Sequence, residues 1–267
     1  MSLLQAIVLG AVQGLTEFIP ISSSGHLVIV PAALGWKEPG LTFDVLLHIA
    51  SLIALVAYFW KDLIEIVRGT FTGDGKARRL ALMLVIGTIP AAIAGLALGD
   101  YFDRSFEDAR SAAVQLVITA FILVAGEQVL SRRTKGLESG KKLRQMDDLR
   151  APDATAIGIA QAIAILPGIS RSGSTIAAGL GLGFERDDSA RFGFLLAVPA
   201  LLGAAILEAP DIGRATIGTG AAVAGFIASL VTSYVAIAAL IRYLKTNTLY
   251  PFAAYCVIAG IVFYFLV

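Results

Sequence analysis

The chain has 267 residues, of which 57% are hydrophobic and only 15% charged, and its mean hydropathy is +0.80. An ordinary soluble domain carries about 25% charged residues, so the composition excludes a soluble globular protein. The net charge of +1 points to no class of partner. The single cysteine excludes an internal disulfide and a cysteine-ligated metal cluster, and two histidines argue against a cage of several histidines. We therefore expect an integral membrane protein.

The first apolar stretch, at about 3–35, is interrupted by Pro20 and by the run SSSGH at 22–26. Irregular backbone at membrane depth is tolerated only where it is buried in protein or lines a wet cavity. The stretch therefore predicts two short half-helices joined at a polar break. Such a re-entrant hairpin enters and leaves the membrane on the same side.

Three continuously apolar stretches follow, at about 42–60, 80–99 and 111–130. Each has about the 20 residues that a helix needs to cross roughly 30 Å of hydrocarbon. Helices are favoured over barrel strands, because barrel strands alternate between apolar and polar residues. The hydrophilic segment 131–153 is predicted to be a solvated connecting loop, with a basic patch facing lipid headgroups as the alternative.

The second half of the chain repeats this order. The stretch at about 154–183 is broken by Pro167 and Gly168 and by the run SRSGS at 170–174, and it predicts a second re-entrant hairpin. Three further spans are expected, at about 191–209, 217–240 and 248–267. The predicted fold is an all-α integral membrane protein with six transmembrane helices and two re-entrant hairpins, forming one membrane domain over 1–267.

The positive charges support this topology. Sixteen of the 21 lysines and arginines fall in segments that it places on one side, at 61–79, 131–153, 184–191 and 241–247. Four lie on the other side, and Arg171 lies inside the second break. Because Lys and Arg concentrate in cytoplasmic loops, both chain ends and the first hairpin are predicted outside, and the second hairpin enters from the cytoplasm. The alternative is eight spans, with each broken stretch crossing fully.

The two broken stretches resemble one another at an offset of 148 residues, GAVQGLTEFIPISSSGH beside GIAQAIAILPGISRSGS. The matched positions are Gln13 with Gln161, Ser22 with Ser170, Ser24 with Ser172 and Gly25 with Gly173. Three spans follow each hairpin, and an odd number of crossings turns the second copy over. We therefore expect an inverted repeat, with repeat 1 at about 3–130 and repeat 2 at about 154–267. Such repeats place a site near the midplane of the bilayer.

Two charged residues, Glu17 and Arg171, lie within the predicted membrane-embedded stretches. Inserting a charged side chain there costs about 2.5–3.5 kcal/mol, so its presence indicates a functional role. Gln13 shares a helix face with Glu17. The breaks add further polar side chains, namely Ser22, Ser23, His26, Ser170, Ser172 and Ser174. The forked donors of arginine match phosphate oxygens, and the N-termini of half-helices attract anions. The set therefore predicts phosphate chemistry.

Several roles follow from these residue types. One serine is a candidate nucleophile with His26 as its base, and Glu17 is a candidate ligand of a divalent cation, which prefers oxygen. The alternative is that Glu17 and Arg171 form an ion pair that only packs the hairpins. Asp44 and His48 are expected to take part in a hydrogen bond along their helix, and Glu127 to extend from the end of its span to the interface.

Four motifs carry a resemblance to a known family: QGLTE at 13–17, FIPISSSGHL at 18–27, PGISRSGST at 167–175 and RFGFLLAVPA at 191–200. The chain closely resembles the undecaprenyl-diphosphatase family of the bacitracin-resistance type over nearly its whole length. The resemblance implies hydrolysis of undecaprenyl diphosphate to undecaprenyl phosphate and inorganic phosphate, which recycles the lipid carrier of peptidoglycan synthesis. It also implies the bacterial inner membrane, a divalent cation (Mg²⁺ or Ca²⁺) and a site open to the periplasm.

The family's functional positions fall on Gln13, Glu17, Ser22, Ser23, His26, Ser170, Arg171 and Ser172. Gln13 stands where many members have a second glutamate, which argues against a metal held by two carboxylates. The expected reaction is in-line attack on the terminal phosphorus. Arg171 and the loop hydroxyls, including Ser174, would bind the diphosphate, Glu17 and Gln13 would hold the metal, and His26 would activate Ser23 or a water molecule.

A transporter that flips a polyprenyl phosphate is the competing hypothesis, because broken helices in inverted repeats are common among transporters and the fold alone does not decide function. His26 beside Ser23 favours an enzyme, because transport requires no proton-transfer group. A structural protein without chemistry is disfavoured by the two buried charges. No nucleic-acid partner is expected, and the small-residue faces permit a homodimer without requiring one.

Overall fold

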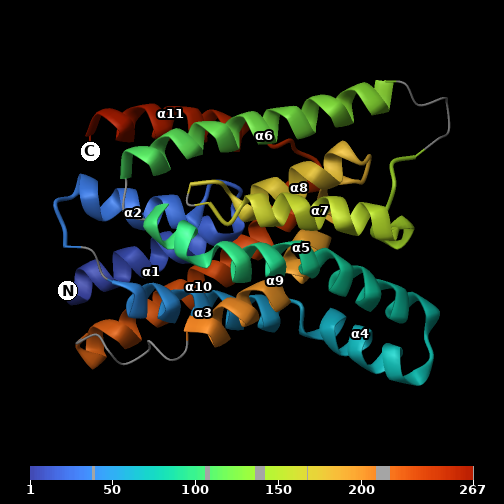
Figure 1. Cartoon of the computed structure of the whole chain (residues 1–267), viewed down its shortest axis with the longest axis horizontal. Helices are drawn as coiled ribbons and strands as arrows, with labels where there is room; N and C mark the ends of the chain where they lie inside the picture. Colours follow the sequence, from blue (N-terminus) through green and yellow to red (C-terminus); the bar gives the residue numbers. More distant parts are fainter. Residues whose placement is uncertain (38–39, 106–108, 136–141, 167, 209–216, 267) are drawn as a thin grey trace.

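The computed structural model describes residues 1–37, 40–105, 109–135, 142–166, 168–208 and 217–266. Over these residues the regular structure is helical, without a strand, as the composition predicted. Figure 1 shows the long helices lying alongside one another, with the two chain termini at the same end of the molecule.

The first broken stretch forms helices α1 (Leu3–Phe18) and α2 (Ser23–Ala33). Ile19, which follows α1, is extended. Ser22 caps the start of α2, because its hydroxyl accepts a hydrogen bond from the Gly25 N–H at 3.3 Å. The helices have 16 and 11 residues and run back along one another (Figure 1). Each is shorter than the roughly 20 residues of a crossing, and the second helix turns back along the first. Both features support the predicted hairpin over the alternative in which the broken stretch crosses the membrane once.

The second broken stretch forms α7 (Ala151–Ile163) and α8 (Arg171–Gly181). Ser170 caps α8 by accepting a hydrogen bond from the Gly173 N–H at 3.0 Å, which is the cap that Ser22 and Gly25 make 148 residues earlier. Pro167, expected at this break, lies outside the described residues. Figure 1 shows the two hairpins pointing toward each other from opposite ends of the bundle.

All six predicted spans are helices. They are α3 (Leu41–Tyr58), α5 (Gly75–Ser105), α6 (Ala109–Lys135), α9 (Arg186–Glu208), α10 (Thr219–Leu244) and α11 (Tyr250–Leu266). Within the described part of the chain five of them are long and apolar enough to cross a membrane. The sixth, α11, has 17 residues, near the lower limit of about 17 for a crossing. The protein is an all-α, multi-pass membrane protein.

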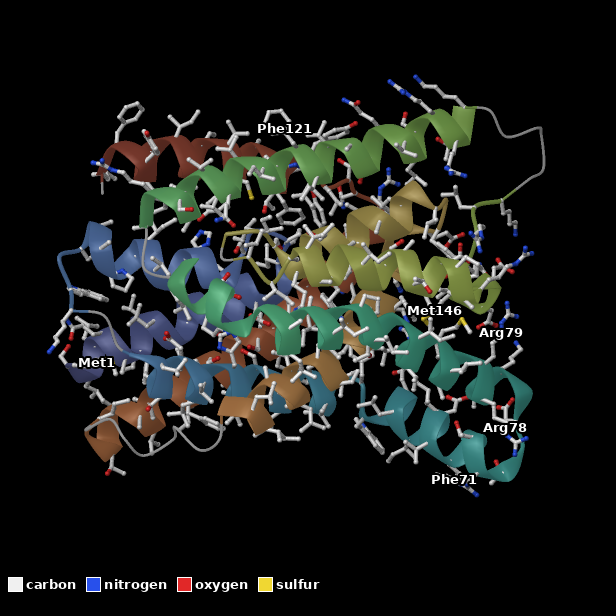
Figure 2. All side chains as sticks on the ribbon, in the orientation of Figure 1. Met1, Phe71, Arg78, Arg79, Phe121 and Met146 are labelled. Atoms are coloured by element: carbon white, nitrogen blue, oxygen red, sulfur yellow. The ribbon has the colours of Figure 1, made fainter. Side chains whose placement is uncertain are left out.

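The end of the bundle opposite the termini is the basic one. Figure 2 shows Arg78 and Arg79 at that end and Met1 at the other. The short helix α4 (Trp60–Thr72) and the turn η1 (Met146–Asp148) lie there as well. The predicted loop 131–153 is shorter than expected, because α6 continues to Lys135 and α7 begins at Ala151; residues 136–141 lie outside the described ranges.

The first helix of each hairpin, α1 or α7, packs on a span from the other half of the chain. A Cβ on Gly10 of α1 would lie 2.2 Å from the carbonyl oxygen of Gly225 on α10. A Cβ on Gly158 of α7 would lie 2.3 Å from the carbonyl oxygen of Gly87 on α5. Only glycine permits such close approach of two backbones. The small-residue faces that permit a dimer are, at these positions, occupied within the chain.

Glu127 does not reach the interface, and the prediction for it was wrong. Its side chain is 1% exposed and accepts hydrogen bonds from the Arg186 guanidinium at 2.6 to 3.2 Å and from the Leu249 N–H at 2.8 Å. It therefore joins α6 to the start of α9 and to the residue before α11. Burial is tolerated because the charge is paired and its oxygens are hydrogen-bonded.

A second ion pair lies at the basic end. Arg144 binds Asp153, near the start of α7, through two hydrogen bonds of 3.0 and 2.5 Å, and its guanidinium lies 4.1 Å from the centre of the Phe184 ring. Burial raises the pKa of the Asp153 carboxyl, but hydrogen bonds from Arg144 and from the Arg150 N–H outweigh it, so that the pKa lies below its ordinary 3.8. The ionised form therefore stabilises the fold.

We expect Asp153→Asn to lower the Tm of the detergent-purified protein by about 3–8 °C at pH 7, equivalent to about 1–3 kcal/mol. Because the folded pKa is lowered, this stabilisation is complete above the unfolded pKa and is lost as the pH falls through the folded one. The difference in Tm between wild type and variant should therefore shrink toward pH 3.5. A difference that does not change with pH would contradict a role for the ionised carboxylate.

Candidate active site

The two hairpin tips are in direct contact. The Ser24 hydroxyl accepts a hydrogen bond from the Gly168 N–H at 3.4 Å, and the Ser172 hydroxyl donates one to the Ile19 carbonyl at 3.4 Å. A Cβ on Gly25 would lie 3.1 Å from the Gly168 Cα. The polar breaks, which lie about 150 residues apart in sequence, therefore form one site inside the bundle, as predicted.

Glu17 is at the centre of this site and is 6% exposed. Its carboxylate accepts hydrogen bonds from Gln13 Nε2 at 3.0 Å and from the Ser23 hydroxyl, and it forms an ion pair with the Arg171 guanidinium. A buried carboxylate requires such partners, because desolvation without them is costly. Three of the other predicted site residues thus contact Glu17 directly.

His48 approaches the same carboxylate, which the sequence did not reveal. Its Nδ1 donates to the Asp44 carbonyl at 2.8 Å, the hydrogen bond expected along the helix, and its Nε2 lies 3.8 Å from Glu17 Oε2. Its side chain is 34% exposed, compared with 4% for that of Glu17. His48 therefore lies between the buried carboxylate and the outside of the bundle.

His26 is also in the site, but its partner is unexpected. Its Nδ1 lies 2.7 Å from the Ser22 carbonyl, which can only accept, so Nδ1 carries a proton. In the neutral ring Nε2 is then an acceptor, and it receives the hydroxyl proton of Tyr255 on α11 at 2.8 Å. The two rings are stacked, with centroids 5.7 Å apart. His26 was predicted to activate Ser23 or a water molecule. The side-chain partners that the structure gives to these two residues are Tyr255 for His26 and Glu17 for Ser23.

Two of the loop serines, Ser22 and Ser170, cap the second helix of their hairpins. Ser22 has φ +70°, the only positive φ of a non-glycine residue in the described part of the chain, which is a strained conformation. The Ser170 hydroxyl lies 3.2 Å from that of Ser172. The Ser174 hydroxyl is buried without a hydrogen-bond partner among the described residues. Buried polar atoms are nearly always satisfied, so Ser174 is available to a ligand.

Thr119 on α6 holds the second loop in place, and no pattern in the sequence pointed to this residue. Its hydroxyl accepts from the Ser170 N–H at 3.0 Å and donates to the Gly168 carbonyl at 2.9 Å. Thr119 is 1% exposed. One side chain thus fixes both ends of the turn that leads into Arg171.

Glu17 and Gln13 offer oxygen ligands to a hard cation, but they do not form a complete ligand set. No group of three His, Cys, Asp or Glu side chains suited to a metal occurs among the residues that the structure describes. The Oε1 atom of Gln13, beside Glu17, is buried and lacks a hydrogen-bond partner within the same residues. Magnesium commonly binds one or two protein oxygens together with water and substrate phosphates. The site therefore fits a cation shared with a bound phosphate.

The two halves supply different chemistry at matched positions. At the offset of 148 residues, Glu17 corresponds to Ile165, Ser23 to Arg171 and His26 to Ser174. The first hairpin thus carries the carboxylate and the imidazole, and the second carries the guanidinium. Because the opposite charges come from different hairpins, the site exists only where the tips meet.

Comparison with known proteins finds similarity along the whole chain. A family model described as "Bacitracin resistance protein BacA" matches residues 6–262. A protein named undecaprenyl-diphosphatase from Gloeobacter violaceus is 45% identical over 260 residues, covering 94% of this chain and 87% of its own. Proteins of the same name from Geobacter sulfurreducens and Methanosphaera stadtmanae are 42% and 40% identical, and in both the match covers at least 96% of either chain.

The pair of Glu17 and Arg171 generates a test by double-mutant cycle. Glu17→Gln and Arg171→Met should each lower the free energy of unfolding in detergent by about 3–5 kcal/mol, because each leaves the partner's charge buried and unpaired. The double variant should lose less than the sum, with a coupling of about 1–3 kcal/mol. As a control, Glu17→Gln and Asp153→Asn should add to within about 0.5 kcal/mol. Additive losses for Glu17 and Arg171 would contradict the ion pair.

Proposed function

The chain belongs to the BacA family of bacitracin resistance proteins, and we propose on this basis that it hydrolyses undecaprenyl diphosphate to undecaprenyl phosphate and inorganic phosphate. The names of the relatives support this activity, and their similarity covers nearly the whole chain. The reaction returns the lipid carrier to peptidoglycan synthesis and explains resistance to bacitracin.

One observation carries the proposal at the level of the site. The buried Glu17, in the last turn of α1, and the partly buried Arg171, at the start of α8, form an ion pair beside the N-termini of α2 and α8, inside a bundle of apolar helices. N-terminal N–H groups and a guanidinium attract phosphate oxygens. Apolar helices around them suit a lipid tail. A lipid diphosphate combines both features in one molecule.

Arg171 is the main anchor of the diphosphate in this proposal. Among the described residues its guanidinium donates to Glu17, and a guanidinium has five N–H donors, so further donors remain for phosphate oxygens. The Ser22, Ser170, Ser172 and Ser174 hydroxyls complete the binding site. Donors fixed before the reaction stabilise charge that develops on phosphate oxygens in the transition state.

Proton transfer is assigned to His26, and Ser23 or a water molecule is the nucleophile. In the resting site the Tyr255 hydroxyl donates to the Nε2 lone pair of His26 and orients the ring, so this hydroxyl must turn away before Nε2 accepts a proton. Glu17 accepts the Ser23 proton in the resting site, so the serine oxygen is turned toward the carboxylate and Arg171. When bound, a divalent cation held by Glu17 and the Gln13 carbonyl oxygen would neutralise charge on the phosphate oxygens.

We place the protein in the bacterial inner membrane, with the basic end in the cytoplasm and the site open to the periplasm. The end with Arg78 and Arg79 lies opposite both termini (Figure 2), and positive residues favour the cytoplasmic side. The partly exposed His48 lies in the N-terminal half of α3 and places its Nε2 3.8 Å from Glu17 Oε2. It therefore lies between the proposed periplasmic side and the carboxylate. The reciprocal packing of α1 on α10 and of α7 on α5 supports an inverted repeat.

The direct test measures phosphate released from a long-chain polyprenyl diphosphate by the purified protein in detergent. Wild type should release phosphate, and a chelator should suppress the release. Arg171→Ala should lower kcat/KM by roughly 10²–10³-fold, the effect of removing a fixed donor to the transition state. His26→Ala should abolish turnover while the lipid still binds.

Two controls separate hydrolysis from transport. Folding of each variant is checked by the Tm, because Arg171→Ala also breaks an ion pair. Folded wild type that releases no phosphate, yet moves a polyprenyl phosphate across the bilayer of reconstituted vesicles, would overturn the enzyme and support the flippase.

Tyr255 provides a test of how His26 is positioned. Tyr255→Phe retains the stacked ring and removes the hydroxyl, and should lower kcat about 3–30-fold with little change in KM, because a lost hydrogen bond is worth about 0.5–1.5 kcal/mol or somewhat more in a buried site. The pH dependence of kcat should shift as well, because Nε2 loses a donor. A rise in KM with unchanged kcat and an unchanged pH dependence would contradict positioning through His26.

A further inference from the structure

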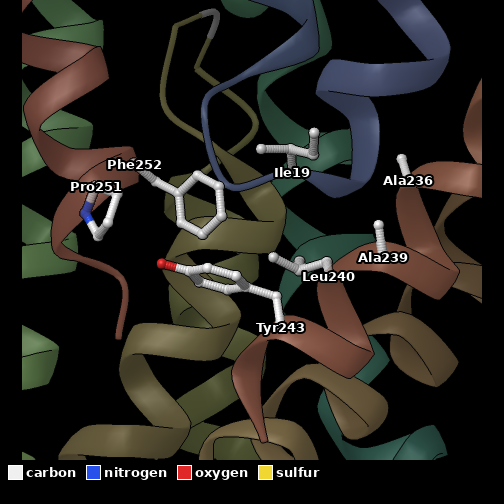
Figure 3. A pocket seen from close by; sticks show the side chains of 7 residues that line it. All are labelled: Ile19, Ala236, Ala239, Leu240, Tyr243, Pro251 and Phe252. Carbon is white, nitrogen blue, oxygen red and sulfur yellow. The ribbon is translucent and has the colours of Figure 1, made fainter. Parts of the chain in front are cut away.

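An apolar pocket of about 300 Å³ lies beside the first hairpin tip (Figure 3). Its lining residues are Ile19, Ala236, Ala239, Leu240, Tyr243, Pro251 and Phe252. Six come from α10 and α11, and Ile19 comes from the break between α1 and α2. Figure 3 shows the Tyr243 and Phe252 rings next to each other on one side of the pocket and Ile19 on another.

The pocket exists because two consecutive helices diverge. α10 packs on α1 and α3, whereas α11 packs chiefly on α6. Near the turn that joins them, the Tyr243 and Phe252 rings meet edge to face with centroids 5.3 Å apart. The small side chains of Ala236 and Ala239 leave the volume above these rings open. Ala239 and Pro251 are exposed, so the pocket is accessible from outside the bundle, where lipid surrounds a membrane protein.

The pocket adjoins the proposed catalytic site at one residue, Ile19. Ile19 is two positions from Glu17, and its carbonyl accepts the hydrogen bond from Ser172. Tyr255, which binds His26, lies one turn beyond Phe252 on α11. From this site the pocket extends toward the basic end of the bundle, where α10 ends and α11 begins.

We propose that this pocket binds the first isoprenoid units of the substrate's tail. The inference rests on the proposed diphosphatase activity. The lining presents only hydrocarbon and aromatic surface apart from the Tyr243 hydroxyl, which suits an isoprenoid chain and not a headgroup. A diphosphate held at Arg171 places the first units of the tail at Ile19, which is one of the lining residues.

The test substitutes Ala239→Trp, which fills the pocket from an exposed position. KM for undecaprenyl diphosphate should rise roughly tenfold, in the range of a hydrophobic pocket that loses its fit. KM for isopentenyl diphosphate, whose single isoprenoid unit fills little of the pocket, should stay within about twofold. Ala92→Trp is the matched control, because Ala92 is exposed on α5, which does not line the pocket, and it should change neither value.

A second measurement does not depend on the tryptophan variant being folded. An undecaprenyl diphosphate analogue with a photoreactive group in the isoprenoid units next to its diphosphate should label the segments that carry Tyr243 and Phe252 in wild type, and unlabelled undecaprenyl phosphate should compete. Labelling confined to other helices would overturn the proposal, as would equal changes in KM for both substrates. Labelling that a tenfold excess of bulk phospholipid removes would assign the pocket to membrane lipid instead. Folded wild type inactive on both substrates would instead refute the diphosphatase itself, and the subsite with it.

Discussion

The arrangement depends on the burial of one carboxylate. Glu17 lies at the tip of a hairpin inside the bundle, where water is not available to solvate it, and it requires donors from several directions. Gln13 is supplied by its own helix, Ser23 by the next and Arg171 by the opposite hairpin. Satisfying this charge therefore brings the two hairpins together, and the same contact assembles the site that binds the diphosphate.

Internal similarity explains how the parts of the site are distributed. The matched serine caps at Ser22 and Ser170 form both half-helices in the same way, with their N-termini at the centre. Between these shared features the halves differ, so that the acidic and imidazole groups belong to one hairpin and the guanidinium to the other. Glycine contacts between α1 and α10, and between α5 and α7, hold each hairpin against the opposite half. The geometry of the site is thus supported by packing across the repeat.

Helix α11 links chemistry to lipid recognition. One side of its first turns presents Phe252 to the apolar pocket, and the next turn presents Tyr255 to His26. The proposed subsite for the lipid tail and the histidine assigned to proton transfer therefore contact the same helix. Filling the pocket would hold α11, and with it the hydroxyl that orients His26, in one position.

The sequence by itself predicted the spans, the two broken helices, the basic end and the meeting of Glu17 and Arg171 in one place, because hydropathy, proline breaks and charges at membrane depth are local properties with large energies. Their direct ion pair was only the alternative to a role in binding phosphate and metal. The sequence did not determine the partners of His26, the approach of His48 to Glu17, the role of Thr119, or the burial of Glu127. Each of these depends on which helices are neighbours and on the rotation of each helix about its axis. Tyr255 meets His26 across 229 residues of chain, and only the packing of α11 on the rest of the bundle decides that contact.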